Sequence, residues 1–394
     1  GRRSYRPSAV FRRAEENLNI LVVGEAGTWF DHHVIASLRD IGHHVSVFHY
    51  GNAVGEYYSR ARWSERAAKN RALLKQATEL KADRGLDLIF CYVYDDFLLP
   101  DVAAALSALG APMVNYNVDM TNQWYRQIRT ARYFTTMLCA QRVHMNDLAR
   151  YGAPVDFFPM AARAPNVADG HAFEIRSPVS FLGTPMPDRI AVLDTLSKAG
   201  VSLAIYGKFW NEGLIASADH NLQKTFDDII AYGVARCRAE GIGALWAVLM
   251  LRLGDDRYDG GPSKIDASLL HGFLSDADVP ALFRNSKINL GFTRMAPGDP
   301  DRPGAMQVKL RDFEVPSCGG FYLVERAPDY AEFFVEGREM VTWRTVGELM
   351  EKIRYYLDHE SERRAIAVAG ERRALREHLW KHRFSALFAK LGIG

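Results

Sequence analysis

The stretch "KLRDFEVPSCGGFYLVE", residues 309–325, contains the repeating unit that decides the fold. Its charged first half predicts a short helix, its small residues "CGG" predict a stop, and "FYLVE" predicts a buried strand. A helix, a stop and an apolar strand in succession are typical of parallel α/β sheets. The stretch also raises a chemical question, because Arg311 and Glu314 lie on a helix aimed at the end of a strand. A surface ion pair or a bound nucleotide would explain them.

The same alternation of strand, turn and helix extends along the whole chain. In the second half, the expected strands are "VSFLG" (179–183), "VSLAIYGKFW" (201–210), "KINLGFT" (287–293), "FYLVE" (321–325) and "EMVTW" (339–343). In the first half they are "NILVVGEAG" (19–27), "HHVSVFHYG" (43–51), "LDLIFCYVYDD" (86–96), "PMVNYNVDM" (112–120), "YFTTMLCA" (133–140) and "VDFFPMA" (155–161). The pattern therefore predicts an α/β fold with two Rossmann-like domains, each built on a doubly wound parallel sheet.

A polar, proline-bearing segment, "ARAPNVADGHAFEIRSP", separates the two series and reads as a linker. We expect a first Rossmann-like domain at residues 1–165 and a second at 166–375. The second series is interrupted at about residues 211–268, which we interpret as a helical insertion. A helix at about residues 376–394 ends the chain.

Composition narrows the class of protein. The chain has 394 residues and a net charge of only +2, so bulk electrostatics give no reason to expect nucleic-acid binding. Its four cysteines lack metal-ligand spacing, which favours a reduced, cytoplasmic protein. No apolar run reaches the ~20 residues that span a bilayer. The arginine-rich residues 2–13 and the apolar residues 242–253 are candidates for peripheral membrane contact. A solvated terminus and a buried helix are their alternative explanations.

In open α/β sheets, ligands bind outside the carboxyl ends of the strands, so side chains just after strands are the candidates for chemistry. In the first domain, Asp119 follows an expected strand and is a candidate general base. His32 begins the helix after the first strand and is the second candidate. Asp95 and Asp96 also follow a strand. Capping of the next helix is the alternative for the aspartates, and a surface or capping role is the alternative for His32.

In the second domain, Gly183 ends a strand and allows close backbone approach, and Arg189 enters a helix whose amino end favours phosphate. Lys208 extends a cation after another strand. Gly272 and Phe273 form a tight turn before a helix that we expect an aspartate to cap, and backbone groups of such a turn can pair with a base.

The segment before the opening stretch is rich in proline and glycine and leads into the charged helix. Gln307, Arg311 and Glu314 recur at i, i+4 and i+7, so we expect them on one helical face. Pro316 is expected to strain or end that helix. Cations at a helix amino end suit a diphosphate, and a carboxylate two turns further suits the two hydroxyls of a ribose.

The stretch "RDFEVPSCGGFYLVERAPDYAEFFVEGREMV", with the later "SERRAIAVAGERRALREH", resembles the carboxyl-terminal domain of CgeB-like (spore-maturation-type) glycosyltransferases. The resemblance covers about residues 266–383 best and is weaker in the first domain. It implies the GT-B class, in which two Rossmann-like domains face each other across a cleft. It further implies that residues 1–165 bind the acceptor, that residues 166–375 bind a nucleotide-sugar donor, and that the last helix packs back on the first domain.

The resemblance also implies individual roles. Glu314 would bind the donor ribose, Lys309 and Arg311 would lie near the diphosphate, Gly183 would approach it closely, and the Gly272-Phe273 turn would face the base. This sequence departs from related retaining families in one respect: Met306 stands where they carry a second glutamate. Because of this difference, the resemblance identifies neither the residue that contacts the transferred sugar nor the stereochemistry of the reaction.

The sequence therefore predicts a metal-independent glycosyltransferase that uses a nucleoside-diphosphate sugar as co-substrate and needs no other cofactor. The acceptor would be a hydroxyl on a glycan, lipid or protein. Two alternatives remain: a sugar-nucleotide epimerase of the same fold, and a catalytically degenerate protein that acts as a sugar-nucleotide sensor or scaffold.

Overall fold

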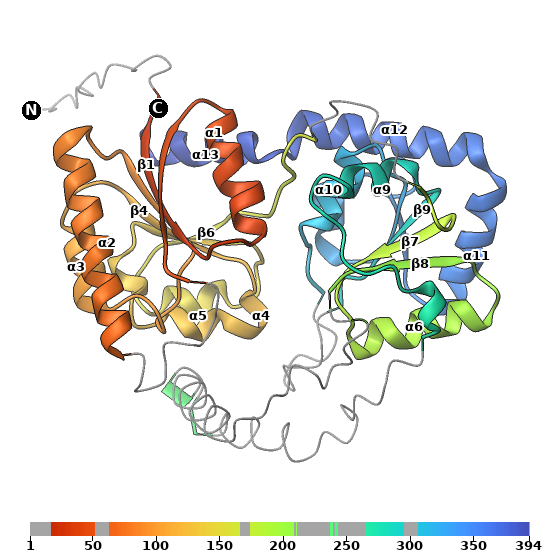
Figure 1. Cartoon of the computed structure of the whole chain (residues 1–394), viewed down its shortest axis with the longest axis horizontal. Coiled ribbons are helices and arrows are strands. Elements are labelled where there is room, and N and C mark those ends of the chain that lie inside the picture. The colour runs from red at the N-terminus through yellow and green to blue at the C-terminus, as the bar shows by residue number, and fades with distance from the viewer. Residues whose placement is uncertain are drawn as a thin grey trace, which may run out of the picture.

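A computed structural model describes residues 17–51, 63–165, 174–208, 210, 237–238, 241–242, 265–294 and 306–393. The described strands form two separate parallel sheets, each flanked by helices, which confirms the predicted α/β class with two Rossmann-like units (Figure 1). Most of the predicted insertion at residues 211–268, and the arginine-rich first residues, lie outside the described parts.

The first sheet has the strand order β2-β1-β3-β4-β5-β6. Its strands are β1 (Asn19–Gly24), β2 (His44–His49), β3 (Leu88–Cys91), β4 (Met113–Asn117), β5 (Thr136–Cys139) and β6 (Val155–Phe157). The apolar run of β1 is buried because it lies between β2 and β3, with both faces covered. The helical segments are η1 (Asp31–Ile35), α1 (Ala36–Asp40), α2 (Trp63–Asp83), α3 (Pro100–Ser107), α4 (Met120–Gln123), η4 (Trp124–Gln127), η5 (Ala131–Tyr133) and α5 (Met145–Ala149).

The second sheet has the strand order β11-β10-β9-β7-β8. Its strands are β7 (Val179–Leu182), β8 (Leu203–Tyr206), β9 (Ile288–Gly291), β10 (Tyr322–Glu325) and β11 (Val341–Trp343). The helical segments are α6 (Pro187–Lys198), η7 (Ala267–Leu269), α9 (Val279–Asn285), α10 (Arg311–Ser317), η8 (Pro328–Glu332), α11 (Val346–Asp358), α12 (Glu360–Glu377) and α13 (Trp380–Leu391).

The neighbouring strands β7 and β9 form the switch point of the second sheet. The helix after β7, α6, packs its leucines into one hydrophobic cluster, whereas α10, after β9, packs Phe313 and Val315 into another. Chain segments therefore leave the two strands toward opposite faces, which opens the carboxyl edge between them to a ligand.

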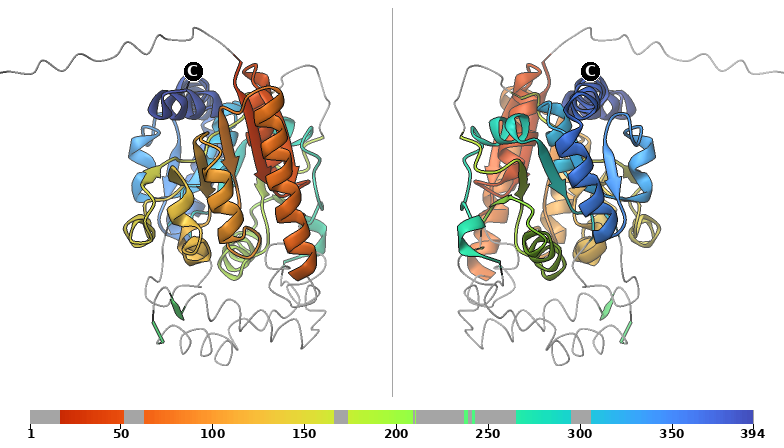
Figure 2. Two further views of the ribbon diagram at one scale, coloured as in Figure 1. Left: turned by 90° about the vertical axis from the view of Figure 1, so that its left-hand side faces the viewer. Right: turned by 90° about the vertical axis from the view of Figure 1, so that its right-hand side faces the viewer.

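The last helix returns to the first domain. Trp380 packs edge-on against Tyr116, at 5.9 Å between ring centroids, and Phe384 packs against Phe90 at 5.9 Å. The side views show α13, in dark blue, at the same end of the molecule as α1, in red, and the two helices are in contact (Figure 2). These buried aromatic contacts therefore hold the last helix against the first sheet.

Two expectations about helices were wrong in detail. Gln307 does not share a helical face with Glu314, because α10 begins only at Arg311 and Gln307 lies in the preceding segment. Pro316, by contrast, lies where expected: α10 continues only one residue beyond it, to Ser317, and ends before Cys318-Gly319-Gly320. Asp278 occupies the N-cap position of α9 but makes no side-chain capping bond, because its carboxylate pairs with the hydroxyl of Ser275 instead.

Candidate functional site

The two domains meet at Glu314, a buried carboxylate on α10. Its Oε1 lies 2.9 Å from Nε2 of His33, on η1 of the first domain, and its Oε2 accepts a hydrogen bond of 2.5 Å from Arg311 Nη1. The Arg311–Glu314 pair that the sequence allows is therefore present. It differs from an ordinary surface pair because only 9% of the Glu314 side chain is exposed and because a residue of the other domain takes part.

The electrostatic surroundings keep Glu314 ionised. Burial by itself opposes ionisation, but Arg311 and then His33 outweigh it and lower the pKa of Glu314 to about 2. A carboxylate held in this state only accepts hydrogen bonds, so the group suits a ligand that presents hydroxyls.

Gln307 makes a second contact between the domains. Its Nε2 lies 3.3 Å from the carbonyl oxygen of Val118 and 3.5 Å from Oδ1 of Asp119, at the end of β4. Burial raises the pKa of Asp119, while Gln307 and Lys309 oppose this. Asp119 stands at the N-cap position of α4 without a capping bond, so the capping explanation does not hold for it. Its carboxylate instead faces the second domain.

Lys309 and Arg189 form a cationic group at the carboxyl edge of the second sheet. Lys309 Nζ donates to the carbonyl oxygens of Phe292, at 3.0 Å, and Arg294, at 3.4 Å. Burial, followed by the charge of Arg189, lowers the pKa of Lys309 to about 8. The positive charges of Lys309 and Arg189 repel each other, and an anionic ligand such as a diphosphate would offset that repulsion.

Gly183 and Arg189 lie where the sequence places them, after β7. A Cβ atom on Gly183 would come within 2.6 Å of the Phe181 ring, and its carbonyl oxygen accepts a 2.7 Å bond from Trp210 Nε1. The close packing against the Phe181 ring is therefore sufficient to explain why residue 183 is a glycine. Arg189 donates through Nη1 to the Thr184 carbonyl at 3.0 Å.

The tight turn predicted at Gly272-Phe273 is wrong: the chain is irregular at residues 271–275 and turns only at residues 276–278, before α9. Phe273 itself lies beside Lys208. The carbonyl of Gly272 accepts a 2.8 Å bond from the backbone of Gly207, and the ammonium of Lys208 lies 4.7 Å from the centre of the Phe273 ring. Phe273 is 63% exposed, which leaves its ring available for stacking.

His32 links the segment after Phe273 to the first domain. Its Nδ1 lies 3.7 Å from the carboxylate of Asp276. Burial, followed by the neighbouring His33, lowers the pKa of His32. Asp119 thus lies against Gln307, and His32 lies against Asp276, each across the contact between the domains. Their chemical roles stay predictions.

Sequence reasoning missed Glu25, which directly follows β1. The side chain is only 6% exposed, and its Oε1 has no hydrogen-bond partner in the described part of the chain. Burial, and then the charge of Asp96, raises the pKa of Glu25 to about 7. Asp96 itself forms a buried 2.8 Å ion pair with Arg126. The rule that selected carboxylates after strands also applies to Glu25 and would have found it.

Asp95, in contrast, is structural. Its carboxylate accepts from the backbone of Arg129 at 2.8 Å and from the Thr130 hydroxyl at 2.7 Å. No group of three or more His, Cys, Asp or Glu within the described ranges is arranged to hold a metal ion, and metal independence stays a prediction. All four cysteines are free. None of the described helices combines the length and apolar composition that a bilayer crossing requires.

Comparison with known proteins adds a family match and structural relatives. Residues 243–389 match the family described as Glycosyl transferase-like. HepE from Anabaena, in complex with UDP and glucose, aligns with a TM-score of 0.57 and 12% identity over 95% of this chain and 100% of its own. Sucrose-phosphate synthase from Thermosynechococcus elongatus aligns with a TM-score of 0.54 and 10% identity over 95% and 99%. The chain has the GT-B fold.

A glycosyltransferase from Rickettsia africae shares this GT-B architecture, with a TM-score of 0.52 and 10% identity over 96% of this chain and 98% of its own. No curated protein sequence matches significantly. The carboxyl-terminal part of the GT-B chain is thus glycosyltransferase-like, and the CgeB-like subgroup stays a prediction.

Proposed function

We propose that the protein is a glycosyltransferase that moves a sugar from a nucleoside-diphosphate donor to a hydroxyl of a glycan, lipid or protein, without a metal ion. One observation carries this proposal: an ionised, buried carboxylate, Glu314, at the contact between the domains of a GT-B fold. A carboxylate has about four acceptor positions. Glu314 therefore retains capacity for the two hydroxyls of a ribose beside His33 and Arg311. Structural relatives bound to UDP and glucose, or to UDP-glucose, make UDP the first nucleotide to test.

We assign the remaining donor contacts from the positions of the side chains at the edge of the second sheet. Arg189, Lys309 and Arg311 would stabilise the leaving diphosphate, because charge develops on its oxygens as the glycosidic bond breaks. Lys208 and the exposed ring of Phe273 would hold the base. Gln307 would contact the sugar, since its Oε1 lacks a partner among the described residues.

If the reaction inverts the anomeric centre, Asp119 takes the proton of the acceptor hydroxyl as its oxygen attacks and the diphosphate leaves with the bonding electrons. Its buried setting supports this role, because a raised pKa brings a carboxylate closer to the pKa of an effective base. His32 is the second candidate and Glu25 the third. If the reaction retains configuration, these groups contact the acceptor instead.

One observation favours a second candidate, a catalytically degenerate sensor or scaffold. By the resemblance stated above, Met306 stands where related retaining families carry a second glutamate, and its sulfur accepts a 3.4 Å hydrogen bond from the Thr293 hydroxyl. A thioether cannot replace a carboxylate beside a reacting sugar.

Release of nucleoside diphosphate from UDP-sugars, measured with and without candidate acceptors, distinguishes these functions. A transferase releases the nucleotide faster when its acceptor is present. An epimerase interconverts the sugar without an acceptor, and a sensor binds the donor but leaves it intact. Either of the last two results would overturn the proposal.

A further inference from the structure

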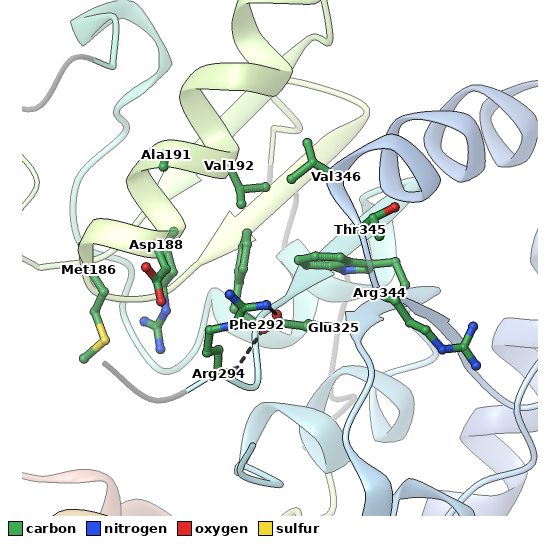
Figure 3. A pocket seen from close by; sticks show the side chains of 12 residues that line it. Met186, Asp188, Ala191, Val192, Phe292, Arg294, Glu325, Arg344, Thr345 and Val346 are labelled. Carbon is green, nitrogen blue, oxygen red and sulfur yellow. Dashed lines mark hydrogen bonds and ion pairs between the residues drawn. The ribbon is translucent and has the colours of Figure 1, made fainter. Parts of the chain in front are cut away.

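A cavity of about 280 Å³ lies between the amino ends of α6 and α11, at the carboxyl edge of the second sheet (Figure 3). Phe292 and Val192 contribute apolar walls, and the ion pair between Arg294 and Glu325 borders it. This volume is near the lower end of ligand sites in proteins, about 300–1,000 Å³. The cavity therefore suits a ligand about the size of a monosaccharide.

Two buried N–H groups of the cavity lining lack acceptors. Trp343 is 3% exposed, and its Nε1 has no hydrogen-bond partner within the described ranges of the chain. The same holds for Nε of Arg189, which enters the cavity lining from α6. A buried donor left unpaired costs about 1–3 kcal/mol. An oxygen-bearing ligand in the cavity would recover that cost at both positions.

The lining carries both signs of charge, with the carboxylates of Asp188 and Glu325 beside the guanidinium groups of Arg189, Arg294 and Arg344. Its unpaired buried groups, however, are donors and therefore suit an anion. Glu325 is already satisfied by Arg294 Nη2 at 3.0 Å and by the Arg294 backbone N–H at 2.9 Å. What remains for a ligand is the N–H of Trp343 and the guanidinium of Arg189. The amino end of α11 is already capped, because the Thr345 hydroxyl accepts a 3.1 Å bond from the Glu348 N–H. Arg344 stands at the rim with its side chain directed away from Phe292 and Glu325 (Figure 3).

The cavity adjoins the Glu314 site and shares with it Arg189, which we also propose to contact the donor diphosphate. Lys309 donates to the carbonyls of Phe292 and Arg294, both of which line the cavity, while the chain continues from Lys309 into α10. The cavity belongs to the side of the sheet covered by α6 and α11, whereas Glu314 lies on α10 at the opposite face. A group bound here could belong to the donor or to another molecule.

We propose that this cavity binds the carboxylate or phosphate group of a sugar-sized ligand. The anion has two sources: an acidic sugar carried by the donor, such as a uronic acid, or a separate sugar phosphate. The first source rests on the proposed transferase function, and the second does not.

Isothermal titration with glucose, glucuronate, glucose 6-phosphate, UDP-glucose and UDP-glucuronate tests the proposal on the full chain. Trp343→Phe removes the N–H and keeps an aromatic wall. Trp380→Phe is a matched control, because Trp380 also carries a buried, unpartnered Nε1 among the described residues but lies in α13. Val192→Phe provides an independent variant that fills the cavity.

In the wild type, at least one anionic probe should bind about tenfold more tightly than its neutral counterpart, as expected for one additional charge-assisted hydrogen bond. Trp343→Phe and Val192→Phe should abolish this preference, and Trp380→Phe should retain it. A preference shown by glucose 6-phosphate that survives Glu314→Gln identifies a separate ligand. One shown only by UDP-glucuronate identifies an acidic donor sugar.

Equal binding of every anionic probe and its neutral counterpart would overturn the proposal, as would a preference unchanged in both cavity variants. If the protein is not a transferase, the same titrations give a different result. All nucleotides would then fail to bind, whereas the response to glucose 6-phosphate would still decide whether the cavity is an anion site.

Discussion

Replacing Glu25 with glutamine is expected to stabilise the protein at alkaline pH. The pKa of Glu25 rises from 4.5 to about 7 on folding, because burial and Asp96 disfavour its charge. Between these values the folded state binds a proton that the unfolded state releases, so the stability present below pH 4.5 is lost as the pH rises through 7. The difference of about 2.5 pKa units, at 1.36 kcal/mol per unit, corresponds to about 3 kcal/mol. Glu25→Gln removes this cost while keeping the shape of the side chain.

Urea denaturation of wild type and Glu25→Gln at pH 5 and pH 8 measures the effect. The variant should exceed the wild type by about 2–3 kcal/mol in free energy of unfolding at pH 8. The difference should become much smaller at pH 5, where Glu25 is protonated in the folded wild type. Glu332→Gln is the control: this carboxylate is 48% exposed, and its change should be small at both pH values. A destabilised variant at pH 8, or an equal difference at both pH values, would refute the reasoning.

Three further variants test the site, the return of the last helix and the backbone. Glu314→Gln should weaken UDP binding by roughly 10- to 100-fold in calorimetric titration, because a hydrogen bond to a charged group contributes about 1.5–3 kcal/mol; unchanged affinity would exclude Glu314 from the donor site. Phe384→Ala, at a fully buried ring, should lower the free energy of unfolding by about 3–5 kcal/mol in urea denaturation, and a loss below about 1 kcal/mol would contradict the observed packing. Gly207→Ala should lower the melting temperature measured by calorimetry, since its φ is +143° and the new Cβ would meet the Gly183 carbonyl oxygen at 2.1 Å; an unchanged melting temperature would argue against that backbone geometry.

The sequence predicted the fold because strands buried on both faces of a parallel sheet appear in the sequence as continuous apolar runs. The run "NILVVGEAG" contains β1, which ends at Gly24, and α10 ends just before the predicted stop "CGG", with Gly319 at a φ of +76°. The residue at which α10 begins could not be predicted in the same way. The spacing of Gln307, Arg311 and Glu314 fits a helix, but the backbone of Gln307 donates to the Thr293 carbonyl at 3.0 Å instead. Local periodicity contains no information about that long-range bond.

The candidate site was predicted in part for a similar reason. Strand ends identified Asp119, Arg189 and Lys208, since parallel strands deliver their carboxyl ends to one edge. The pairing of His33 with Glu314 depends on how two separately folded domains meet. No spacing within either segment encodes that distance. Between adjacent histidines, only the three-dimensional arrangement shows that His33, rather than His32, reaches the carboxylate.

The central claim, that Glu314 forms part of a nucleotide-sugar donor site, is tested most directly by nucleotide binding. Thermal unfolding of the wild type with UDP, GDP, dTDP and CMP, repeated on Glu314→Ala, is the measurement. We expect one nucleotide to raise the melting temperature selectively and the variant to lose that increase. If no nucleotide stabilises the wild type, or if the variant responds equally well, Glu314 does not bind a donor and the transferase proposal fails.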